Sequence, residues 1–218
     1  MQNKKSFFSF VPEMEAQDKI LKTSLELFFK YGIKRVTMDD IAKELGMSKK
    51  TIYQFYKEKD DLVNQLCQIE LQKQNAEFAQ LQDMATDPVH EMILISERLR
   101  SMLQPINPMF FLDLQKFYPA GFAQFQKFKD ECSSVLILKN IRVGVESGLY
   151  RKDINIEFTA QYRLAQMDMM IFGNYFSYDK ISFAKAHELI LDMFVYSICT
   201  IKGHKLINNY KKIKEEEQ

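Results

Sequence analysis

The chain contains few residues that interrupt helices. Its 218 residues include 7 glycines, 5 prolines and no tryptophan, and runs that alternate apolar and polar residues are few. This composition argues against a sheet and favours helices. Because 46% of the residues are hydrophobic, with 18 phenylalanines and 12 methionines among them, the chain can bury a large and adaptable apolar interior. We therefore predict an all-α fold.

Cysteine is also scarce, and long apolar runs are missing. Cys67, Cys132 and Cys199 are an odd, widely spaced set without a C-x-x-C pair, which argues against a disulfide framework and against a zinc site. No apolar run approaches membrane-spanning length. The segment from Phe7 to Val11 is too short for the core of a signal peptide. We expect a cytoplasmic protein that does not enter a membrane.

Sequence signatures of catalysis are absent as well. The chain has no G-x-S-x-G, no H-E-x-x-H, no P-loop and no dinucleotide-binding fingerprint. Its three histidines, His90, His187 and His204, are scattered, and we interpret the pair His187-Glu188 as an exposed pair on a helix rather than as part of a metal site. We therefore expect no enzymatic activity, no cofactor and no metal.

Charge is unevenly distributed along the chain. The net charge is only +1, but residues 19–59 hold ten basic and five acidic residues, a net charge of +5. A basic segment on a near-neutral chain creates a local field that suits a polyanion. This segment is therefore the first candidate for binding nucleic acid.

Apolar periodicity and capping residues predict about nine helices and three regions. The expected helices cover approximately residues 16–31, 37–45, 49–55, 59–83, 88–104, 108–117, 120–147, 155–175 and 181–204. We expect residues 1–15 to be a mobile arm and residues 16–62 to form a three-helix bundle with a helix-turn-helix. Residues 63–218 are expected to form a larger helical domain for effector binding and dimerisation.

The stretch ELGMSKKTIYQFYKEKDDL, which begins at Glu44, has the order of features that a DNA-reading helix needs. Ser48 caps the helix, and Ile52 with Phe55 or Tyr56 forms an inward stripe. The outward face carries Lys49, Lys50, Tyr53 and Gln54, with Thr51 at its edge. Lysine can bind phosphate or guanine, and glutamine can pair with adenine in the major groove. A short solvated helix is the alternative, but the combined cap, turn and basic face favour DNA binding.

These residues also resemble a known family. Between residues 19 and 62 the chain is similar to the DNA-binding domain of TetR-type transcriptional regulators, the tetracycline-repressor-like family. The matching features are Leu27-Phe28 with Gly32, followed by VTMDDIA, GMS, Thr51, Tyr53 and KEKDDL. A dozen positions agree without a gap, which makes the resemblance specific for this segment.

The resemblance implies roles for individual side chains. It assigns phosphate contacts to Thr37, Ser48, Tyr53 and Lys59, and it places nearest the bases Lys49, Lys50, Thr51 and Gln54. The chain departs from the family pattern at two positions. Lys50 stands where the family often has a small residue, which puts the usual operator preference in doubt. Tyr56 replaces the usual phenylalanine, and we expect it in the core or facing a phosphate.

Two segments near the C-terminus, 158–176 and 181–201, carry apolar residues on every side. A helix that is hydrophobic all round must bury more than one face. The resemblance implies that such helices pack as four between two subunits, whereas burial inside one monomer is the alternative. The residues that we expect in a homodimer interface are Tyr162, Met169, Phe172, Phe183, Ile190 and Phe194.

The segment 102–128 is rich in methionine and aromatic residues, which can line an apolar pocket or simply fill a core. The resemblance implies a small apolar ligand whose binding changes the spacing of two recognition helices. The candidate ligand-binding residues are Met102, Phe110, Phe117, Tyr118, Phe125, Met167 and Met170. Asp168 lies among methionines, and we expect it to pair with Arg163 or a partner chain, or to contact a polar group of a ligand.

The sequence thus predicts a homodimeric, DNA-binding transcriptional regulator. We expect a repressor that a small apolar ligand releases from a near-palindromic site on double-stranded DNA. The second hypothesis is a DNA-bound structural or division-control protein on the same scaffold, without an effector, and a filled core would favour it. A helical enzyme or transport module with an incidental helix-turn-helix is the third hypothesis, which the basic face argues against.

Overall fold

The structure is a computed structural model that describes residues 13–173, 175–176, 178 and 180–213. Within these ranges it contains eleven α-helices, one π-helical turn and no strand, which confirms the predicted all-α fold. The proposed N-terminal arm falls almost entirely outside the described residues. None of the described helices is long and apolar enough to cross a membrane.

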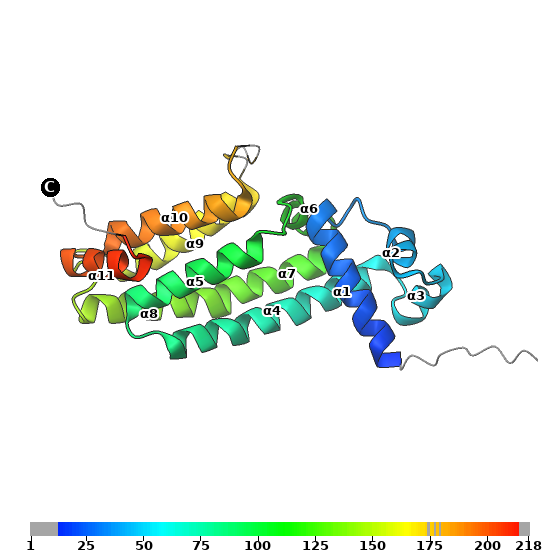
Figure 1. The fold of residues 1–218 in the computed structure, drawn as a ribbon, viewed down its shortest axis with the longest axis horizontal. Coiled ribbons are helices and arrows are strands. Elements are labelled where there is room, and N and C mark those ends of the chain that lie inside the picture. Colours follow the sequence, from blue (N-terminus) through cyan, green and yellow to red (C-terminus); the bar gives the residue numbers. More distant parts are fainter. Residues whose placement is uncertain (1–12, 174, 177, 179, 214–218) are drawn as a thin grey trace, which may run out of the picture.

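Three helices form one end of the molecule, at the right of Figure 1. They are α1 (Glu13–Tyr31), α2 (Met38–Leu45) and α3 (Lys49–Phe55). Local interactions set their limits. Thr37 and Asp40 form a capping box at the start of α2, and Gly46 ends α2 in the left-handed conformation with a φ of 62°. The Ser48 side chain then accepts the Thr51 N–H and starts α3.

The next four helices along the chain are α4 (Lys59–Met84), α5 (Pro88–Leu103), α6 (Met109–Phe117) and α7 (Pro119–Phe128). Helices α4 and α5 extend away from the three-helix end, whereas the short α6 lies beside α1 (Figure 1). Asp87 caps α5 by accepting the N–H groups of Val89 and His90. The helical path of α7 continues through a π-helical turn, Lys129–Ser133, into α8 (Ser134–Glu146). The predicted helix over residues 120–147 is therefore a continuous path with a local widening.

The C-terminal part consists of α9 (Ile156–Phe172), α10 (Phe183–Ile198) and α11 (Ile201–Lys211). A single helix was predicted over residues 181–204, but the chain bends at Cys199 and Thr200. The Thr200 N–H bonds the Leu149 carbonyl at 2.9 Å, and its hydroxyl accepts the Gly203 N–H at 3.3 Å. Thr200 thus ends one helix and caps the next, which explains part of the excess over nine predicted helices.

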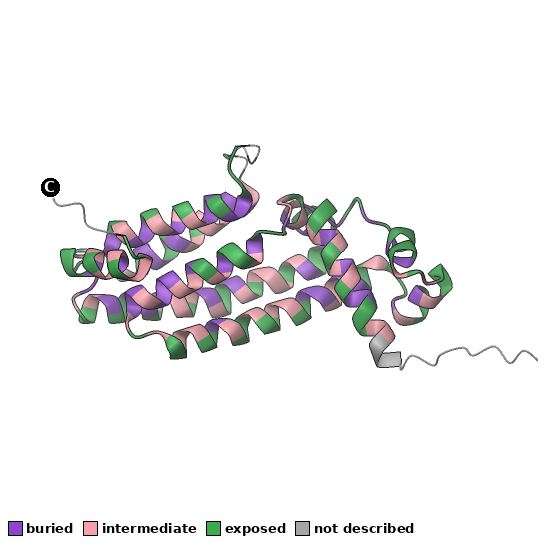
Figure 2. Cartoon of the chain, in the orientation of Figure 1, coloured by how far each residue is buried: buried purple, intermediate pink, exposed green. Residues whose placement is uncertain are grey.

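Buried residues line the inner faces of the helices, in purple in Figure 2. The first core cluster joins α1, α2 and α3 to the start of α4, with Ile20, Ile41, Ile52 and Leu62 fully buried. It also includes Leu114 and Tyr118, which lie beyond the proposed boundary at residues 62 and 63. Separate clusters hold the helices of the C-terminal part together. The N-terminal bundle and the larger region thus share a packed seam.

Candidate DNA-binding surface and ligand cavity

Helix α3 is fixed to the core by its inner side. Ile52 is fully buried, and Tyr56 directly after the helix is almost fully buried. The Tyr56 hydroxyl accepts a hydrogen bond from the Gln17 side chain at 3.4 Å, and burial raises the pKa of this phenol. Tyr56 is therefore a core residue, one of the two positions expected from the sequence. These contacts hold the opposite face of α3 toward solvent.

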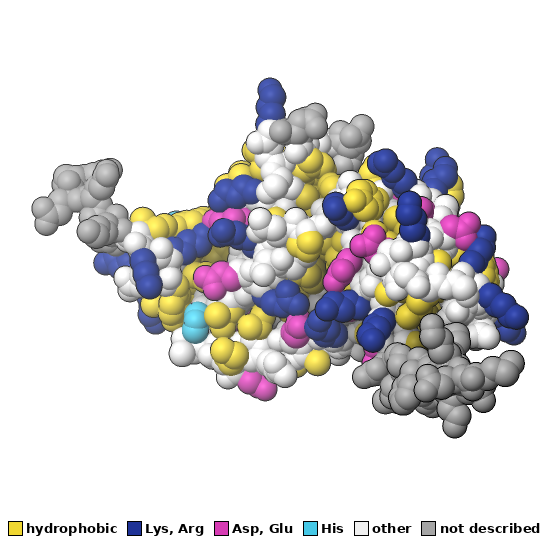
Figure 3. All heavy atoms as spheres, turned by 45° about the vertical axis from the view of Figure 1, so that its right-hand side comes forward, with side chains coloured by type: hydrophobic (Ala, Val, Ile, Leu, Met, Phe, Trp, Pro, Cys, Tyr) yellow, Lys and Arg dark blue, Asp and Glu magenta, His cyan; other side chains and the backbone are white. Residues whose placement is uncertain are grey.

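The outward face of α3 exposes the predicted basic and polar side chains, Lys49, Lys50, Tyr53 and Gln54. Lys49 Nζ lies 2.9 Å from Asp39 Oδ1 on α2, so this lysine must exchange partners before it can bind a phosphate. Lys50 and Gln54 have no side-chain hydrogen bond or ion pair within the described part of the chain. In Figure 3, Lys and Arg side chains are frequent over the end of the molecule that carries α1–α3.

The capping hydroxyls flank this face but already have partners. Thr37 Oγ1 donates to Asp40 Oδ2 at 2.7 Å, and these hydrogen bonds from Thr37 lower the pKa of the Asp40 carboxyl. Ser48 Oγ and Thr51 Oγ1 lie 2.8 Å apart. Thr37 and Ser48 are both exposed residues near the N-terminus of a helix, where backbone N–H groups favour anions. Their phosphate contacts remain predictions.

Lys59 does not lie with this outward face. Its Nζ donates to the Ile33 carbonyl and sits 5.6 Å from the ring centres of both Phe28 and Tyr118. Burial lowers the pKa of Lys59, and the nearby carboxylate of Asp113 opposes this shift. The predicted phosphate contact therefore has no support from this position. The ammonium group instead compensates a backbone carbonyl at the seam between α1, α4 and α6.

Helix α6 connects the N-terminal bundle to the interior of the larger region. Buried Asp113 accepts the Lys34 N–H at 2.8 Å, in the loop before α2. The Asn107 N–H, just before α6, bonds the Phe29 carbonyl on α1 at 2.7 Å. On the same helix, Phe110 and Phe111 line an internal cavity. If α6 were displaced at its cavity side, the loop before α2 would thus be displaced with it.

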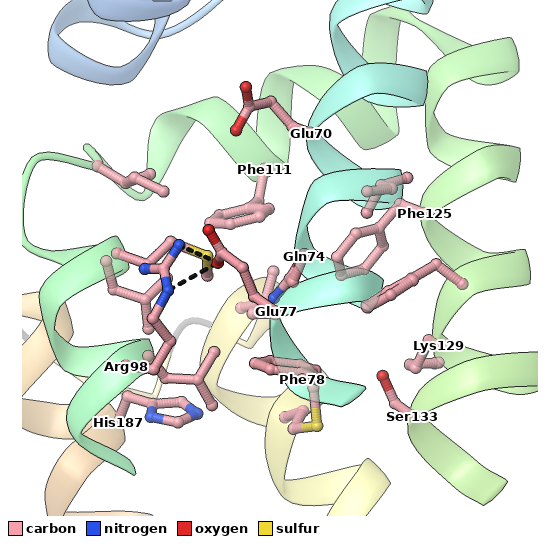
Figure 4. A pocket seen from close by; sticks show the side chains of 18 of the residues that line it. Glu70, Gln74, Glu77, Phe78, Arg98, Phe111, Phe125, Lys129, Ser133 and His187 are labelled. Atoms are coloured by element: carbon pink, nitrogen blue, oxygen red, sulfur yellow. Dashed lines mark hydrogen bonds and ion pairs between the residues drawn. The ribbon is translucent and has the colours of Figure 1, made fainter. Parts of the chain in front are cut away.

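The cavity has a volume of about 180 Å³ and is lined mainly by apolar side chains from α1 and from α4 through α10. Phe78, Phe111 and Phe125 point into it in Figure 4. Five of the predicted ligand-binding residues line it: Met102, Phe110, Phe125, Met167 and Met170. Two do not. The centre of the Phe117 ring lies 4.3 Å from Lys34 Nζ. Tyr118 is buried in the first core cluster.

Several charged residues around the cavity are already paired. Arg98 Nε donates to Glu77 Oε2 at 2.7 Å, and Figure 4 shows these half-buried side chains turned toward each other. Lys129, in the π-helical turn, donates to Asp168 at 2.6 Å. Asp168 therefore pairs with Lys129 and not with Arg163. Buried Glu91 accepts the Asn140 side-chain amide at 2.8 Å.

Two further polar residues of the cavity wall were not predicted as ligand-binding residues, and the expectation that His187 lies exposed on its helix was wrong. Arg163 on α9 and His187 on α10 are each only 3% exposed, and Arg163 Nη2 lies 3.3 Å from His187 Nε2. Burial lowers the pKa of Arg163 to about 10, and burial together with the charge of Arg163 lowers the pKa of His187 to about 3. At neutral pH the arginine is charged and the histidine is neutral. An arginine within an apolar helix was the sequence signal for this pair.

The comparison with protein families decides the assignment of the N-terminal bundle. Residues 20–66 match the family described as bacterial regulatory proteins, tetR family. The N-terminal bundle is therefore similar to the DNA-binding domain of the tetR family. Over 70 residues the chain is 33% identical to an HTH-type transcriptional regulator of Staphylococcus aureus, SAB2452, a match that covers 32% of this chain and 38% of that protein. The chain thus spans well under half the length of the curated relatives that it matches.

Solved structures share the fold of this chain over most of its length. A TetR-family regulator from Agrobacterium tumefaciens has a TM-score of 0.72 at 15% identity, over 86% of this chain and 99% of that one. A regulator from Saccharomonospora viridis in complex with choline has a TM-score of 0.69 at 20% identity, over 86% and 100% of the two chains. At these identities the likeness shows a common fold.

The chain also exposes large apolar side chains along α9 and α10. They include Phe158, Tyr162 and Met169 on α9, and Leu189 and Met193 on α10. Among the predicted interface residues, Tyr162 and Met169 are exposed, and Phe172 and Ile190 are half-buried. Phe183 and Phe194 are instead buried within the chain itself, where they pack in its core clusters, so that they present no surface to a second subunit.

Proposed function

We propose that this protein is a homodimeric DNA-binding transcriptional regulator, a repressor that a small, mainly apolar ligand releases from a near-palindromic operator. The observation that carries the proposal is the outward face of α3, where Lys50, Tyr53 and Gln54 are exposed on a capped helix anchored by Ile52. Such a helix can enter the major groove with its N-terminal half while lysines and hydroxyls bind phosphates.

The exposed apolar face of α9 and α10 supports a homodimer. Side chains such as Tyr162 and Met193 would be removed from water if the same face of a second copy packed against them. Two-fold symmetry would then present two copies of α3 to successive major grooves, about 34 Å apart along the DNA. That arrangement is the reason for proposing a near-palindromic operator.

The cavity and α6 support control by a ligand. Phe110 and Phe111 face the cavity from the helix that also holds Asp113 against the loop before α2. A ligand that favours one position of α6 would shift the population between DNA-competent and DNA-incompetent states. The fold neighbour from Saccharomonospora viridis is a complex with a small molecule, choline. The alternative without an effector would be favoured by a filled core, and a cavity of about 180 Å³ counts against it.

The test is binding of the purified protein to DNA from upstream of its own gene, measured by fluorescence anisotropy at several salt concentrations against a scrambled competitor. We expect selective binding with a steep salt dependence, because phosphate contacts release counterions. If binding is weak, selection from a random DNA pool separates a distant operator from a chain that does not read DNA. Failure to select any sequence would refute the regulator proposal.

A further inference from the structure

The geometry points to an anionic ligand: the cavity binds a small amphipathic carboxylate, with its head group on Arg163 and His187 and its apolar body among the phenylalanines. This inference rests on the proposed ligand-responsive function and specifies the chemical class of the ligand. It follows from three observations, which concern the charge of Arg163, the protonation of His187 and the apolar remainder of the cavity.

Arg163 is a buried charge without a counterion. Its guanidinium is 3% exposed, and within the described residues no carboxylate forms an ion pair with it. Its Nη1 has no hydrogen-bond partner among those residues. The ring of Phe194, 5.8 Å from Cζ, provides only a weak cation–π contact. An unpaired buried charge is costly unless something compensates it, so this cavity wall lacks an anion.

Two other cations of the cavity wall are paired with carboxylates, unlike Arg163. Arg98 is paired with Glu77, and Lys129 is paired with Asp168. Glu91, which also lines the cavity, accepts the amide of Asn140. Arg98 and Lys129 thus each have a carboxylate partner within the protein, whereas Arg163 has only a neutral imidazole. No carboxylate among the described residues pairs with Arg163, and we assign this role to a ligand.

His187 adds a second free donor. Because Arg163 carries protons on both of its terminal nitrogens, His187 Nε2 must be the acceptor in the 3.3 Å contact with Nη2. The neutral ring then carries its proton on Nδ1, and this buried atom has no partner among the described residues. The pair thus offers N–H groups and lacks an acceptor, which a neutral hydrocarbon does not supply. Carboxylate oxygens match a guanidinium in charge and planar geometry.

The rest of the cavity limits the body of the ligand. Its remaining walls are mainly aromatic and aliphatic, including Phe78, Phe111 and Phe125 (Figure 4), and they favour a hydrocarbon chain or ring. Its volume of about 180 Å³ is slightly larger than that of an engineered apolar cavity of about 150 Å³ that binds benzene. A carboxylate with a chain of medium length is the ligand class that fits both the head-group site and this space.

The experiment uses three eight-carbon probes that differ only in the head group: octanoate, octanol and octylamine. Binding to the full-length protein without DNA is measured by isothermal titration calorimetry. We expect octanoate to bind at least tenfold more tightly than octanol, and octylamine to bind most weakly, because its ammonium group would face Arg163. Equal binding of octanoate and octanol would overturn the inference, and this comparison requires no variant.

Variants locate the head group. Arg163→Met should weaken octanoate binding at least tenfold and change octanol binding less than threefold, while its unfolding midpoint stays the same or rises because an unpaired charge is removed. Arg151→Met, which makes the same change at a half-exposed position, is the matched control and should bind octanoate as the natural protein does. Unchanged octanoate binding in Arg163→Met would exclude Arg163 as the anion site.

DNA release is measured separately, so that the two proposals fail in different ways. If octanoate binds through Arg163 but neither it nor octanol releases DNA, the anion site stands and the ligand-responsive function fails. If octanol releases DNA and octanoate does not bind, the regulator stands and the anion site is refuted. Octanoate that binds through Arg163 and releases DNA would support both.

Discussion

The two ends of the molecule treat buried polar groups differently. Seven buried side-chain atoms lack a hydrogen-bond partner within the described residues; only Ser24 Oγ lies in the N-terminal bundle, and six lie between residues 133 and 188. In the bundle, hydroxyls such as those of Thr37 and Ser48 are used as helix caps. Around the cavity, groups such as Arg163 and Ser133 remain unpaired. Most of the unpaired buried groups thus lie in the larger region, where we propose that a ligand and a second subunit bind.

The strongest test of this difference concerns the exposed face of α9 and α10. Met193 is 72% exposed on α10, and Met193→Glu should place like charges across a two-fold interface and produce monomers. Losing the second half-site should lower DNA affinity on the order of 100-fold, since two linked binding events become independent. Met84→Glu changes a 64% exposed methionine at the end of α4 and should leave the dimer intact. Sedimentation that finds a dimer in both variants would contradict the assigned face.

A pair of core substitutions compares the packing of the two regions. Ile52 is fully buried in the first core cluster, whereas Ile137 is only half-buried and lines the cavity. Ile52→Ala should lower the free energy of unfolding by about 2–4 kcal/mol, because it creates a new void. Ile137→Ala should cost only about 1 kcal/mol, because its side chain has fewer packed neighbours on the cavity side. Urea unfolding followed by circular dichroism measures both, and equal costs would mean that the cavity wall is packed as tightly as the bundle.

Acid should destabilise the larger region more than the N-terminal bundle, because the larger region contains the buried His187. Folded His187 takes up its proton near pH 3, whereas in the unfolded chain a histidine does so near its ordinary value of about 6.5. Protonation between these values therefore favours the unfolded state, and each pH unit below about 6.5 should cost at most about 1.4 kcal/mol of unfolding free energy. His187→Gln should reduce this slope between pH 6.5 and 5. The same slope in the variant and in the natural protein would show that His187 does not carry the effect.

Substitutions of two lysines in the N-terminal bundle distinguish an effect on DNA binding from an effect on stability. Lys50→Ala should lower DNA affinity by about 1–3 kcal/mol and reduce the salt slope by about 1, because one cation leaves the interface. Lys59→Met should keep the salt slope and lower the free energy of unfolding by about 1 kcal/mol, because the Ile33 carbonyl loses its donor. Anisotropy titrations and urea unfolding of both variants provide the comparison. A reduced salt slope in Lys59→Met would indicate that Lys59 does contact a DNA phosphate.

The smallest expected effect is that of Tyr53→Phe. The exposed hydroxyl of Tyr53 lies on the outward face of α3, where we propose that it binds a phosphate. Its loss should weaken binding to specific and scrambled DNA equally, by about 1 kcal/mol. A loss confined to the specific site would indicate that Tyr53 reads a base.

The sequence predicted the N-terminal end well because its signals are local. Thr37 and Ser48 cap helices through bonds to residues three positions away, so that the predicted ranges 37–45 and 49–55 lie within one residue of the observed α2 and α3. The inward position of Ile52 follows from helical periodicity alone. The position of Lys59 does not, because its partners Ile33 and Tyr118 come from other parts of the chain.

The features missed in the larger region depend on contacts between distant segments. The bend at Thr200 requires the Leu149 carbonyl, and the pairing of Lys129 with Asp168 requires the π-helical turn to face α9. Arg163 and His187 meet only because α9 and α10 lie side by side, since 24 positions separate them. Methionine and aromatic content indicated five residues of the cavity wall, but it did not distinguish the face of α6 that carries Phe110 from the end that carries Phe117.

Helix α4 connects the N-terminal bundle with the wall of the cavity. Its 26 residues run from Lys59 to Met84, with Leu62 in the first core cluster and Phe78 in the cavity wall. At 1.5 Å per residue this rod is about 39 Å long, so that a tilt of about 5° displaces one end by about 3 Å. That displacement is close to the rise of about 3.4 Å between neighbouring base pairs. Such a small tilt of α4 would therefore suffice to shift α3 by about one base pair along the major groove in which we propose that it binds.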